Sequence, residues 1–219
     1  LHAGEVLGIA GLMGAGRTEF IRTLCGIEKA DDGQCYLRGE MVQINSPMQA
    51  IRLGIGHVSE DRKGLGFIPR LSVLQNLTLS SLGNHQKGLF IDPKSESQVA
   101  QKMIAGLKIK CSSAKQQVGF LSGGNQQKVV IGRVLLTNPD IIILDEPTRG
   151  VDVGAKFEIY KLINELARQG KAILMISSEL PEILGMSDRI MVMSKGKQTA
   201  LLSRKEASQE LIMKYAVQS

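Results

Sequence analysis

A glycine-rich stretch near the start of the chain, residues 11–18, restricts the fold more than any other feature of the sequence. It reads Gly-Leu-Met-Gly-Ala-Gly-Arg-Thr; an apolar run at residues 6–10 before it predicts a buried strand, and residues 19–24 after it predict the opening of a helix. A strand, a glycine-rich loop and a helix in this order are typical of a phosphate-binding loop. Glycines let the backbone fold around a phosphate without a Cβ in the way, and the amides at the helix N-terminus then point at the anion.

The phosphate-loop pattern G-x-x-x-x-G-K-[S/T] fits at every position but one, because Arg17 stands where lysine is expected. Thr18 is placed to offer its hydroxyl to Mg²⁺. The remaining candidates for phosphate contact are the loop positions Gly11, Gly14, Ala15 and Gly16. A glycine-rich turn without a ligand is the alternative for this segment alone, and two later motifs argue against it.

The composition sets the broad class of the protein. With 219 residues and 43% hydrophobic content the chain is long and apolar enough for one substantial core, so we expect a single domain over residues 1–219. The net charge of +6 leaves nucleic-acid binding open, but only 4% of residues are aromatic and no basic block stands out, so we expect no nucleic-acid partner. Three irregularly spaced cysteines argue against a disulfide framework or a zinc site.

A second glycine-bearing loop, residues 121–127, runs directly into a helix that we expect over residues 126–136. Ser122 and the N–H groups of Gly123 and Gly124 would cap this helix and leave donors free for an anion from outside. An ordinary capped helix is the alternative, and for this loop in isolation it is the better explanation.

A third motif follows a run of isoleucine and leucine at residues 140–144, which predicts a strand buried on both faces. Carboxylates at the C-terminal end of such a strand lie where α/β proteins bind ligands. We expect Asp145 to hold Mg²⁺ through water and Glu146 to orient or deprotonate an attacking water. The alternative is a strand that ends in a solvated acidic turn, which the phosphate loop upstream makes the weaker interpretation.

The rest of the sequence predicts short elements joined by polar loops. These are a hairpin at 34–44, helices at 46–53, 72–81, 92–107, 151–169, 180–186 and 205–216, strands at 55–58 and 172–176, a charged loop at 59–64, and a hairpin at 189–202.

The three motifs, in this order, resemble the ATP-binding cassette of ABC-type ATPases, in which a Leu-Ser-Gly-Gly loop between the other two motifs is nearly diagnostic. Residues 60–63 (Glu-Asp-Arg-Lys), 121–128 and 145–156 are similar to one branch, the ATP-binding proteins of bacterial monosaccharide importers (ribose, galactose, xylose, arabinose). The similarity covers essentially all of the chain. That branch carries two cassettes in tandem and this chain resembles the second, so we expect a fragment of a longer tandem-cassette polypeptide.

The resemblance implies an α/β P-loop NTPase fold of the ABC type, with a RecA-like parallel core at residues 1–69 and 129–219 and a helical subdomain at 70–128. It implies an ATPase that uses ATP and Mg²⁺ to drive import of a monosaccharide at the cytoplasmic face of the bacterial inner membrane. The implied partners are the first cassette of the same chain or a second copy, transmembrane permease subunits and, indirectly, a periplasmic sugar-binding protein.

The resemblance also assigns roles to single residues. Each nucleotide in the family lies between the phosphate loop of one cassette and the Leu-Ser-Gly-Gly loop of the other. Glu146 would be catalytic; Thr18, Asp145 and Glu60 would serve the metal. The residues that would act on the partner's nucleotide are Leu121, Ser122, Gly123, Gly124 and Gln126. Asp152 stands at the position of the D-loop, Glu60 at that of the Q-loop and Ser178 at that of the switch histidine.

Three positions depart from the family pattern: Arg17 replaces lysine, Glu60 replaces glutamine and Ser178 replaces histidine. We therefore predict that this domain binds nucleotide in its own site but hydrolyses it slowly or not at all. Its Leu-Ser-Gly-Gly loop at residues 121–127, called the signature loop below, would complete the partner's site. One alternative is that Arg17 works as it stands, with Glu60 binding Mg²⁺ directly. A catalytically weak or dead regulatory module is another. We also expect Arg17 and Glu60 to pair with each other when no nucleotide is bound.

Overall fold

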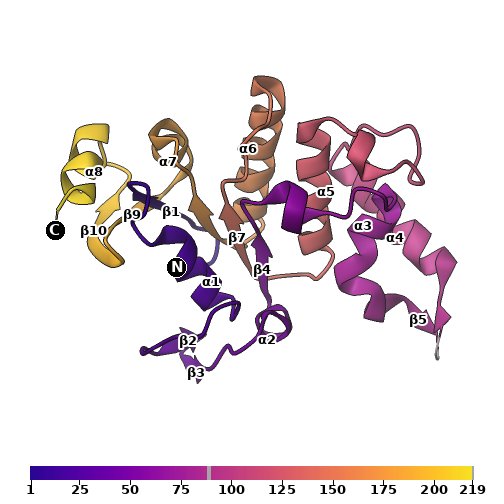
Figure 1. Ribbon diagram of the computed structural model, residues 1–219, viewed down its shortest axis with the longest axis horizontal. Coiled ribbons are helices and arrows are strands. Elements are labelled where there is room, and N and C mark those ends of the chain that lie inside the picture. The colour runs from indigo at the N-terminus through magenta and orange to yellow at the C-terminus, as the bar shows by residue number, and fades with distance from the viewer. Residues whose placement is uncertain (88–89, 219) are drawn as a thin grey trace.

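A six-stranded sheet forms the centre of the fold (Figure 1). The structure is a computed structural model that describes residues 1–87 and 90–218. The strand order is β10-β9-β1-β8-β7-β4, and every neighbouring pair is parallel except β10–β9. The strands are β1 (Val6–Gly11), β4 (Ile55–Val58), β7 (Ile141–Asp145), β8 (Ala172–Ile176), β9 (Arg189–Ser194) and β10 (Lys197–Ser203).

The three central strands, β1, β8 and β7, consist almost entirely of buried aliphatic residues. Parallel strands covered on both faces require such continuous apolar runs. Their register pairs Ile9 with Ile176 and Ile176 with Asp145, so the C-terminal ends of all three strands meet at one edge of the sheet. This edge carries both the glycine-rich loop after β1 and the carboxylates at the end of β7.

Helices cover both faces of the sheet. Helices α1 (Arg17–Leu24) and α2 (Pro47–Arg52) pack on the face to which Leu7 and Ile9 point. The opposite face is covered by α5 (Gly123–Leu135), α6 (Val153–Arg168), α7 (Leu180–Met186) and α8 (Gln209–Ala216) (Figure 1). The alternation of side chains along β1 explains this division, because Val6 and Ala10 point to the second face.

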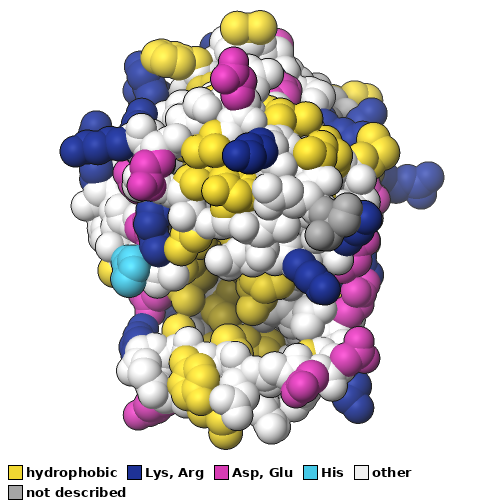
Figure 2. Space-filling view, turned by 90° about the vertical axis from the view of Figure 1, so that its left-hand side faces the viewer, with side chains coloured by type: hydrophobic (Ala, Val, Ile, Leu, Met, Phe, Trp, Pro, Cys, Tyr) yellow, Lys and Arg dark blue, Asp and Glu magenta, His cyan; other side chains and the backbone are white. Residues whose placement is uncertain are grey.

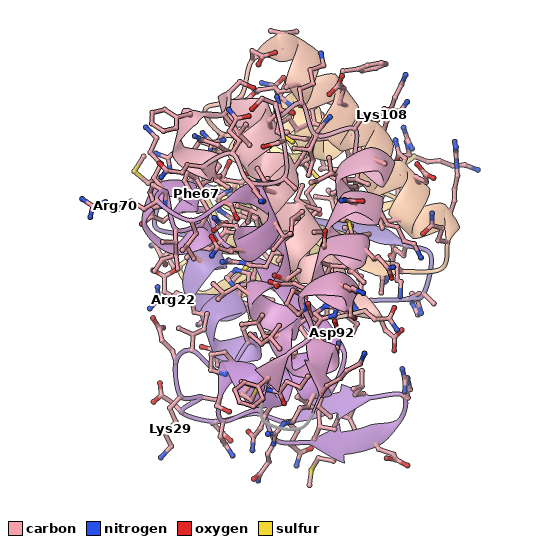
Figure 3. All side chains as sticks on the ribbon, turned by 90° about the vertical axis from the view of Figure 1, so that its right-hand side faces the viewer. Arg22, Lys29, Phe67, Arg70, Asp92 and Lys108 are labelled. Atoms are coloured by element: carbon pink, nitrogen blue, oxygen red, sulfur yellow. The ribbon has the colours of Figure 1, made fainter. Side chains whose placement is uncertain are left out.

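A group of helices lies beyond the β4 edge of the sheet, on the right of Figure 1. It contains α3 (Val73–Thr78), the 3₁₀ segment Leu79–His85 and α4 (Pro93–Gly106), and α3 packs against both α4 and α5. Figure 3 views this side, with Asp92 at the start of α4 and Lys108 just after its end. A mostly parallel sheet with helices on both faces is the expected α/β architecture.

A hollow opens between the sheet and the hairpin of β2 (Cys35–Leu37) and β3 (Glu40–Val42), and hydrophobic side chains line it (Figure 2). Its volume is about 240 Å³, and its walls include Leu7, Phe20 and Tyr36. Exposed apolar surfaces of this kind are typical of places that another segment or protein covers.

Several elements differ from those expected. The charged loop at 59–64 continues into a π-helical turn, Arg62–Gly66, which the carboxylate of Asp61 caps by accepting from the amide of Gly64 at 2.8 Å. The helix expected over 72–81 tightens into the 3₁₀ segment after Thr78. The last helix begins at Gln209 rather than near residue 205, because Ser208 caps it. A small hairpin of β5 (Gln86–Lys87) and β6 (Phe90–Ile91) was not expected.

In the part of the chain that the structure describes, no helix is both long and apolar enough to cross a membrane.

Candidate phosphate-binding site

The glycine-rich loop leaves β1 at Gly11 and enters α1 at Arg17. Two of its glycines need left-handed backbone, since φ is 77° at Gly14 and 88° at Gly16. Gly16 is the residue that caps α1, and having no side chain it makes no side-chain hydrogen bond to the helix amides. The first turn of α1 therefore has amide donors with no side-chain partner, which is the condition for binding an anion.

The loop is held tightly against the turn between β9 and β10. A Cβ on Gly11 would lie 2.6 Å from the carbonyl oxygen of Met193, and a Cβ on Gly16 would lie 3.0 Å from the Cα of Gly196. The amide of Gly196 donates to the carbonyl of Ala15 at 2.9 Å. Side chains larger than hydrogen do not fit at these contacts, so the loop conformation is set by packing as well as by local preference.

A cleft of about 640 Å³ opens in front of this loop. It brings together residues from four parts of the sequence that were predicted to act on one nucleotide. Besides loop residues 11–19, its lining includes Glu60, Asp145, Glu146, Arg149, Ser177 and Ser178. The signature-loop residues and Asp152 do not line this cleft.

Asp145, at the end of β7, is only 2% exposed. Its Oδ1 atom is buried and has no hydrogen-bond partner in the described residues. Burial, reinforced by the charge of Glu146, raises the pKa of Asp145 to about 6. An unsatisfied buried carboxylate oxygen is costly, and a cation or a water held by a cation would relieve that cost.

The residues of the cleft fit Mg²⁺. This ion prefers hard oxygen donors and is held by one or two protein groups together with substrate phosphates. The Asp145 carboxylate and the Thr18 hydroxyl lie on the same cleft, and Glu60 adds a third oxygen donor. Thr18 and Asp145 are the residues that would hold the ion, with Glu60 beside them.

Glu146 has an unusual backbone, with φ at 49° in the left-handed region. Its amide donates to the carbonyl of Ile176 at 3.0 Å, and its Oε2 accepts from the hydroxyl of Ser178 at 3.2 Å. Burial raises the pKa of the Glu146 carboxyl. Left-handed backbone in a residue other than glycine costs about 1–3 kcal/mol and clusters at functional sites. A carboxylate held in this way at a cleft wall can orient or deprotonate a water.

The expected ion pair between Arg17 and Glu60 is wrong. Arg17 donates from Nη1 to the carbonyl of Ser177 at 3.1 Å, whereas Glu60 forms its ion pair with Arg149. The strand order explains both contacts. Strand β8 neighbours β1, so the end of β8 lies beside Arg17, and β7 neighbours β4, so the turn after β7 reaches Glu60.

The signature loop forms a second glycine-rich helix start. Helix α5 begins at Gly123, earlier than expected, because Ser122 is already in the extended conformation of a capping residue. The predicted side-chain cap is wrong: the Ser122 hydroxyl accepts from the Nδ2 atom of Asn125 at 2.8 Å and not from a backbone amide. Gln126 is buried and donates to the carbonyl of Val118 at 3.3 Å, so this side chain secures the preceding turn.

Two arginines near the cleft were missed by reasoning from the sequence. Arg149 pairs with Glu60, and Arg62 donates at 3.4 Å to the carbonyls of Arg149 and Gly150. Both residues lie in segments quoted for the family resemblance, but no spacing rule marks an arginine that bridges two loops. Asp152, predicted from the resemblance, accepts from the amide of Ala155 at 2.9 Å and so caps α6.

The sequence matches known proteins throughout its length. A protein-family model described as ABC transporter matches residues 1–149. The ribose import ATP-binding protein RbsA of Geobacillus kaustophilus is 55% identical over 216 residues, which cover 99% of this chain and 44% of that protein. A putative ribose/galactose/methyl galactoside import ATP-binding protein of Pseudomonas syringae pv. tomato is 51% identical, with 99% and 41% covered. The chain thus spans less than half the length of these relatives.

The fold also matches solved structures. A nucleotide-free ATP-binding cassette from an ABC transporter superposes with a TM-score of 0.83 at 27% identity, covering 100% of this chain and 90% of that one. The ADP conformation of an ABC transporter cassette gives a TM-score of 0.81 at 27% identity, with 99% and 89% covered. The order of the three motifs, the parallel sheet that brings two of them to one cleft, and these matches agree: the chain belongs to the ABC transporter family and is one of its ATP-binding domains.

Proposed function

We propose that this domain binds ATP with Mg²⁺ in the cleft in front of the glycine-rich loop and hydrolyses it slowly. One observation supports this proposal above all. The amides at the start of α1, which have no side-chain partner, lie at the same edge of the sheet as the buried Oδ1 atom of Asp145 and the carboxylate of Glu146. Amides and an acidic metal site together suit a triphosphate, and a carboxylate beside them suits the activation of water.

The residues of the cleft divide the work. The loop residues 11–18 bind the phosphates through main-chain amides, and Thr18 and Asp145 hold Mg²⁺, which neutralises the charge of the phosphates. Glu146 accepts a proton from the attacking water, and Ser178 keeps its carboxylate in place. Arg17 supplies a positive charge, although its guanidinium already donates to the carbonyl of Ser177.

The altered positions support slow hydrolysis in this site. Losing one preorganised contact in a reaction centre costs about 10²–10³ in rate, and Arg17, Glu60 and Ser178 all depart from the family pattern. The signature loop, whose residues do not line this cleft, offers the amides of α5 to the nucleotide of a partner cassette. A second candidate function is a regulatory module without hydrolysis; the engagement of Arg17 with Ser177 favours it.

The relatives' names suggest the wider setting. One is a ribose import ATP-binding protein and another a putative ribose/galactose/methyl galactoside import ATP-binding protein, and each is more than twice as long as the part that this chain matches. We infer that this domain is the second of two cassettes, at the cytoplasmic face of the inner membrane, and serves permease subunits and a periplasmic sugar-binding protein. Residues 1–69 and 129–219 would form its ATP-binding core and residues 70–128 its helical subdomain.

The test is ATP binding and turnover by the full-length protein in its transporter. Glu146→Gln should leave ATP affinity intact and lower turnover, because it removes the proton acceptor but not the phosphate contacts. Glu165→Gln, an exposed change on α6, is the matched control and should do neither. If Glu146→Gln leaves turnover unchanged while ATP still binds, the domain is the regulatory module. If the unaltered protein binds no ATP, the proposal fails as a whole.

A further inference from the structure

A buried carboxylate behind the cleft is the most heavily bonded side chain of the described chain. Glu182, on α7, is 5% exposed, and four side chains donate to it. The Thr148 hydroxyl lies 2.7 and 2.8 Å from its two oxygens. The hydroxyls of Tyr160 and Ser177 lie at 2.6 and 2.8 Å, and Nζ of Lys156 at 3.1 Å. Glu182 is not itself part of the cleft lining.

The hydrogen bonds to Glu182 favour its charged form despite its burial. Desolvation alone would raise the pKa of Glu182, but the hydrogen bonds from Tyr160, Thr148, Ser177 and Lys156 together hold it below its usual range. Burial and the bond to Glu182 raise the pKa of Tyr160 to about 12, so the phenol remains a donor. Burying a charge rarely adds stability over an apolar residue of the same size, so such a group calls for a role in specifying geometry.

Two of the four donors, Thr148 and Ser177, come from the segments that carry Glu146 and Ser178. Thr148 follows Glu146 by two residues, in the turn after β7. Ser177 precedes Ser178 at the end of β8, and its carbonyl accepts from Arg17. The other two donors, Lys156 and Tyr160, lie on α6, the helix that follows this turn.

These ties support a strained residue. Glu146 has a left-handed backbone, and its amide and its carboxylate are held by Ile176, the last residue of β8, and by Ser178, in the loop that follows. The two bonds require the turn after β7 and the loop after β8 to stay in fixed register. Glu182 accepts from Thr148 on one of these segments and from Ser177 on the other, so it links them directly.

We propose that Glu182 is a positioning residue, which holds the turn bearing Glu146 and the loop bearing Ser178 in register so that the Glu146 carboxylate faces the phosphate end of the cleft. The inference rests on the proposed function for its catalytic consequence, but the mechanical link between the two loops stands on the contacts alone. It assigns Thr148 and Ser177, which touch no phosphate in this scheme, to the same task.

The test removes the hydrogen bond from Thr148 and keeps the Glu182 carboxylate. Glu182→Ala would leave several buried donors without an acceptor and would unfold the region, so it does not discriminate. Thr148→Val is nearly the same size and loses only the hydroxyl; Thr148→Ser keeps it. Tyr160→Phe removes a donor that comes from α6 and leaves the link between the loops, which makes it the matched control.

The full-length protein in its transporter is examined by hydrogen exchange, ATP affinity and turnover. In Thr148→Val, amides 176–179, which are remote in sequence from the change, should exchange faster even without nucleotide. ATP affinity should be retained. The turnover that depends on Glu146, measured as the difference between the unaltered protein and Glu146→Gln, should fall about 10-fold to 100-fold, which is the usual cost of losing a residue that orients a functional group. Thr148→Ser should restore both, and Tyr160→Phe should leave the exchange of 176–179 unchanged. In a Glu146→Gln background Thr148→Val should add no further loss.

Unchanged exchange of 176–179 in Thr148→Val would overturn the proposal. Normal turnover in Thr148→Val would also overturn it, provided that Glu146→Gln lowers turnover. Equal losses of turnover in Thr148→Val and Thr148→Ser would overturn it as well. Absence of ATP binding by the unaltered protein would instead refute the proposed function, and the exchange measured without nucleotide would still decide whether Glu182 links the loops.

Discussion

Two helices of this domain, α1 and α5, begin at glycine-rich loops, and their surroundings differ sharply. The start of α1 lies in a cleft with Asp145 and Glu146 from neighbouring strands. The start of α5 lies outside that cleft, after Phe120, whose side chain is 79% exposed. Neither helix has a side-chain cap on its amides. Both ends can therefore receive an anion, and the carboxylates of Asp145 and Glu146 lie in the cleft at the start of α1.

The difference shows what each feature contributes. Free amides at a helix start can bind a phosphate but cannot hydrolyse it. Hydrolysis also needs a metal site and a proton acceptor, and these come from strand ends that the sheet places beside the loop. We therefore propose that the α1 loop holds a nucleotide beside the groups that hydrolyse it. In the same proposal the α5 loop completes a site whose metal and carboxylates belong to another cassette.

The largest effect is expected from a substitution that disrupts the α1 site alone and abolishes its ATP binding. Gly16→Val places a branched side chain at φ 88° and against Gly196, so ATP binding to this domain should be lost, with a stability cost of about 1–2 kcal/mol. Gly170→Val is the matched control, because Gly170 has the same φ of 88° and no neighbouring atom within 4 Å. Thermal unfolding should show the backbone strain in both variants, with an added cost from the Gly196 contact in Gly16→Val, and calorimetry should show lost affinity in Gly16→Val alone. Equal ATP affinity in both would contradict this role for the loop.

The next largest effect is expected from a substitution that disrupts the α5 site alone and lowers turnover of the transporter. Ser122→Glu puts a negative charge at the start of α5, where it should repel a phosphate held by a partner. Turnover of the assembled transporter should fall about 100-fold, the scale of a lost preorganised contact, while ATP affinity of this domain stays unchanged. Ser113→Glu adds the same charge at an exposed position before α5 and should leave turnover as it was. Reduced ATP affinity of the isolated domain in Ser122→Glu would speak against a role in trans.

Restoring the family residues in the α1 site should give a smaller effect, an increase in hydrolysis. The triple change Arg17→Lys, Glu60→Gln and Ser178→His restores the family pattern, and it frees the carbonyl of Ser177 and the Arg149 guanidinium from their present partners. We expect the hydrolysis that depends on Glu146 to rise about 10-fold or more. Single-turnover hydrolysis is the measurement. A rate that stays the same or falls would show that the present residues already form a competent site.

The smallest effect is the dependence on pH. Burial raises the pKa of Asp145 to about 6, so the carboxylate loses its proton only as the pH rises through that value. Its contribution to stability without ligand is present below its ordinary pKa and is lost as the pH rises through about 6. Binding of Mg²⁺ needs the deprotonated form, so Mg²⁺-dependent ATP affinity should fall up to about tenfold per pH unit below 6. Titrations at several pH values check this, and Asp145→Asn should abolish the dependence.

The motifs and most elements could be predicted from the sequence because they are local. An apolar run, a glycine-rich loop and a helical pattern in succession predict where β1 ends and α1 begins, and the end of the buried run 140–144 places Asp145 and Glu146 at a strand end. The partners of Arg17 and Glu60 could not be predicted in the same way, since they depend on which strands are neighbours. Glu182 lay beyond prediction for the same reason: its donors, Thr148, Tyr160 and Ser177, are scattered in sequence and belong to no motif.

Calorimetric titration of ATP with Mg²⁺ into this chain carrying Gly16→Val or Ser122→Glu shows whether the two glycine-rich helix starts serve different nucleotides. We expect no binding heat from the Gly16→Val chain, and we expect the Ser122→Glu chain to bind as the unaltered chain does. Loss of binding in the Ser122→Glu variant, or retained binding in Gly16→Val, would contradict this expectation.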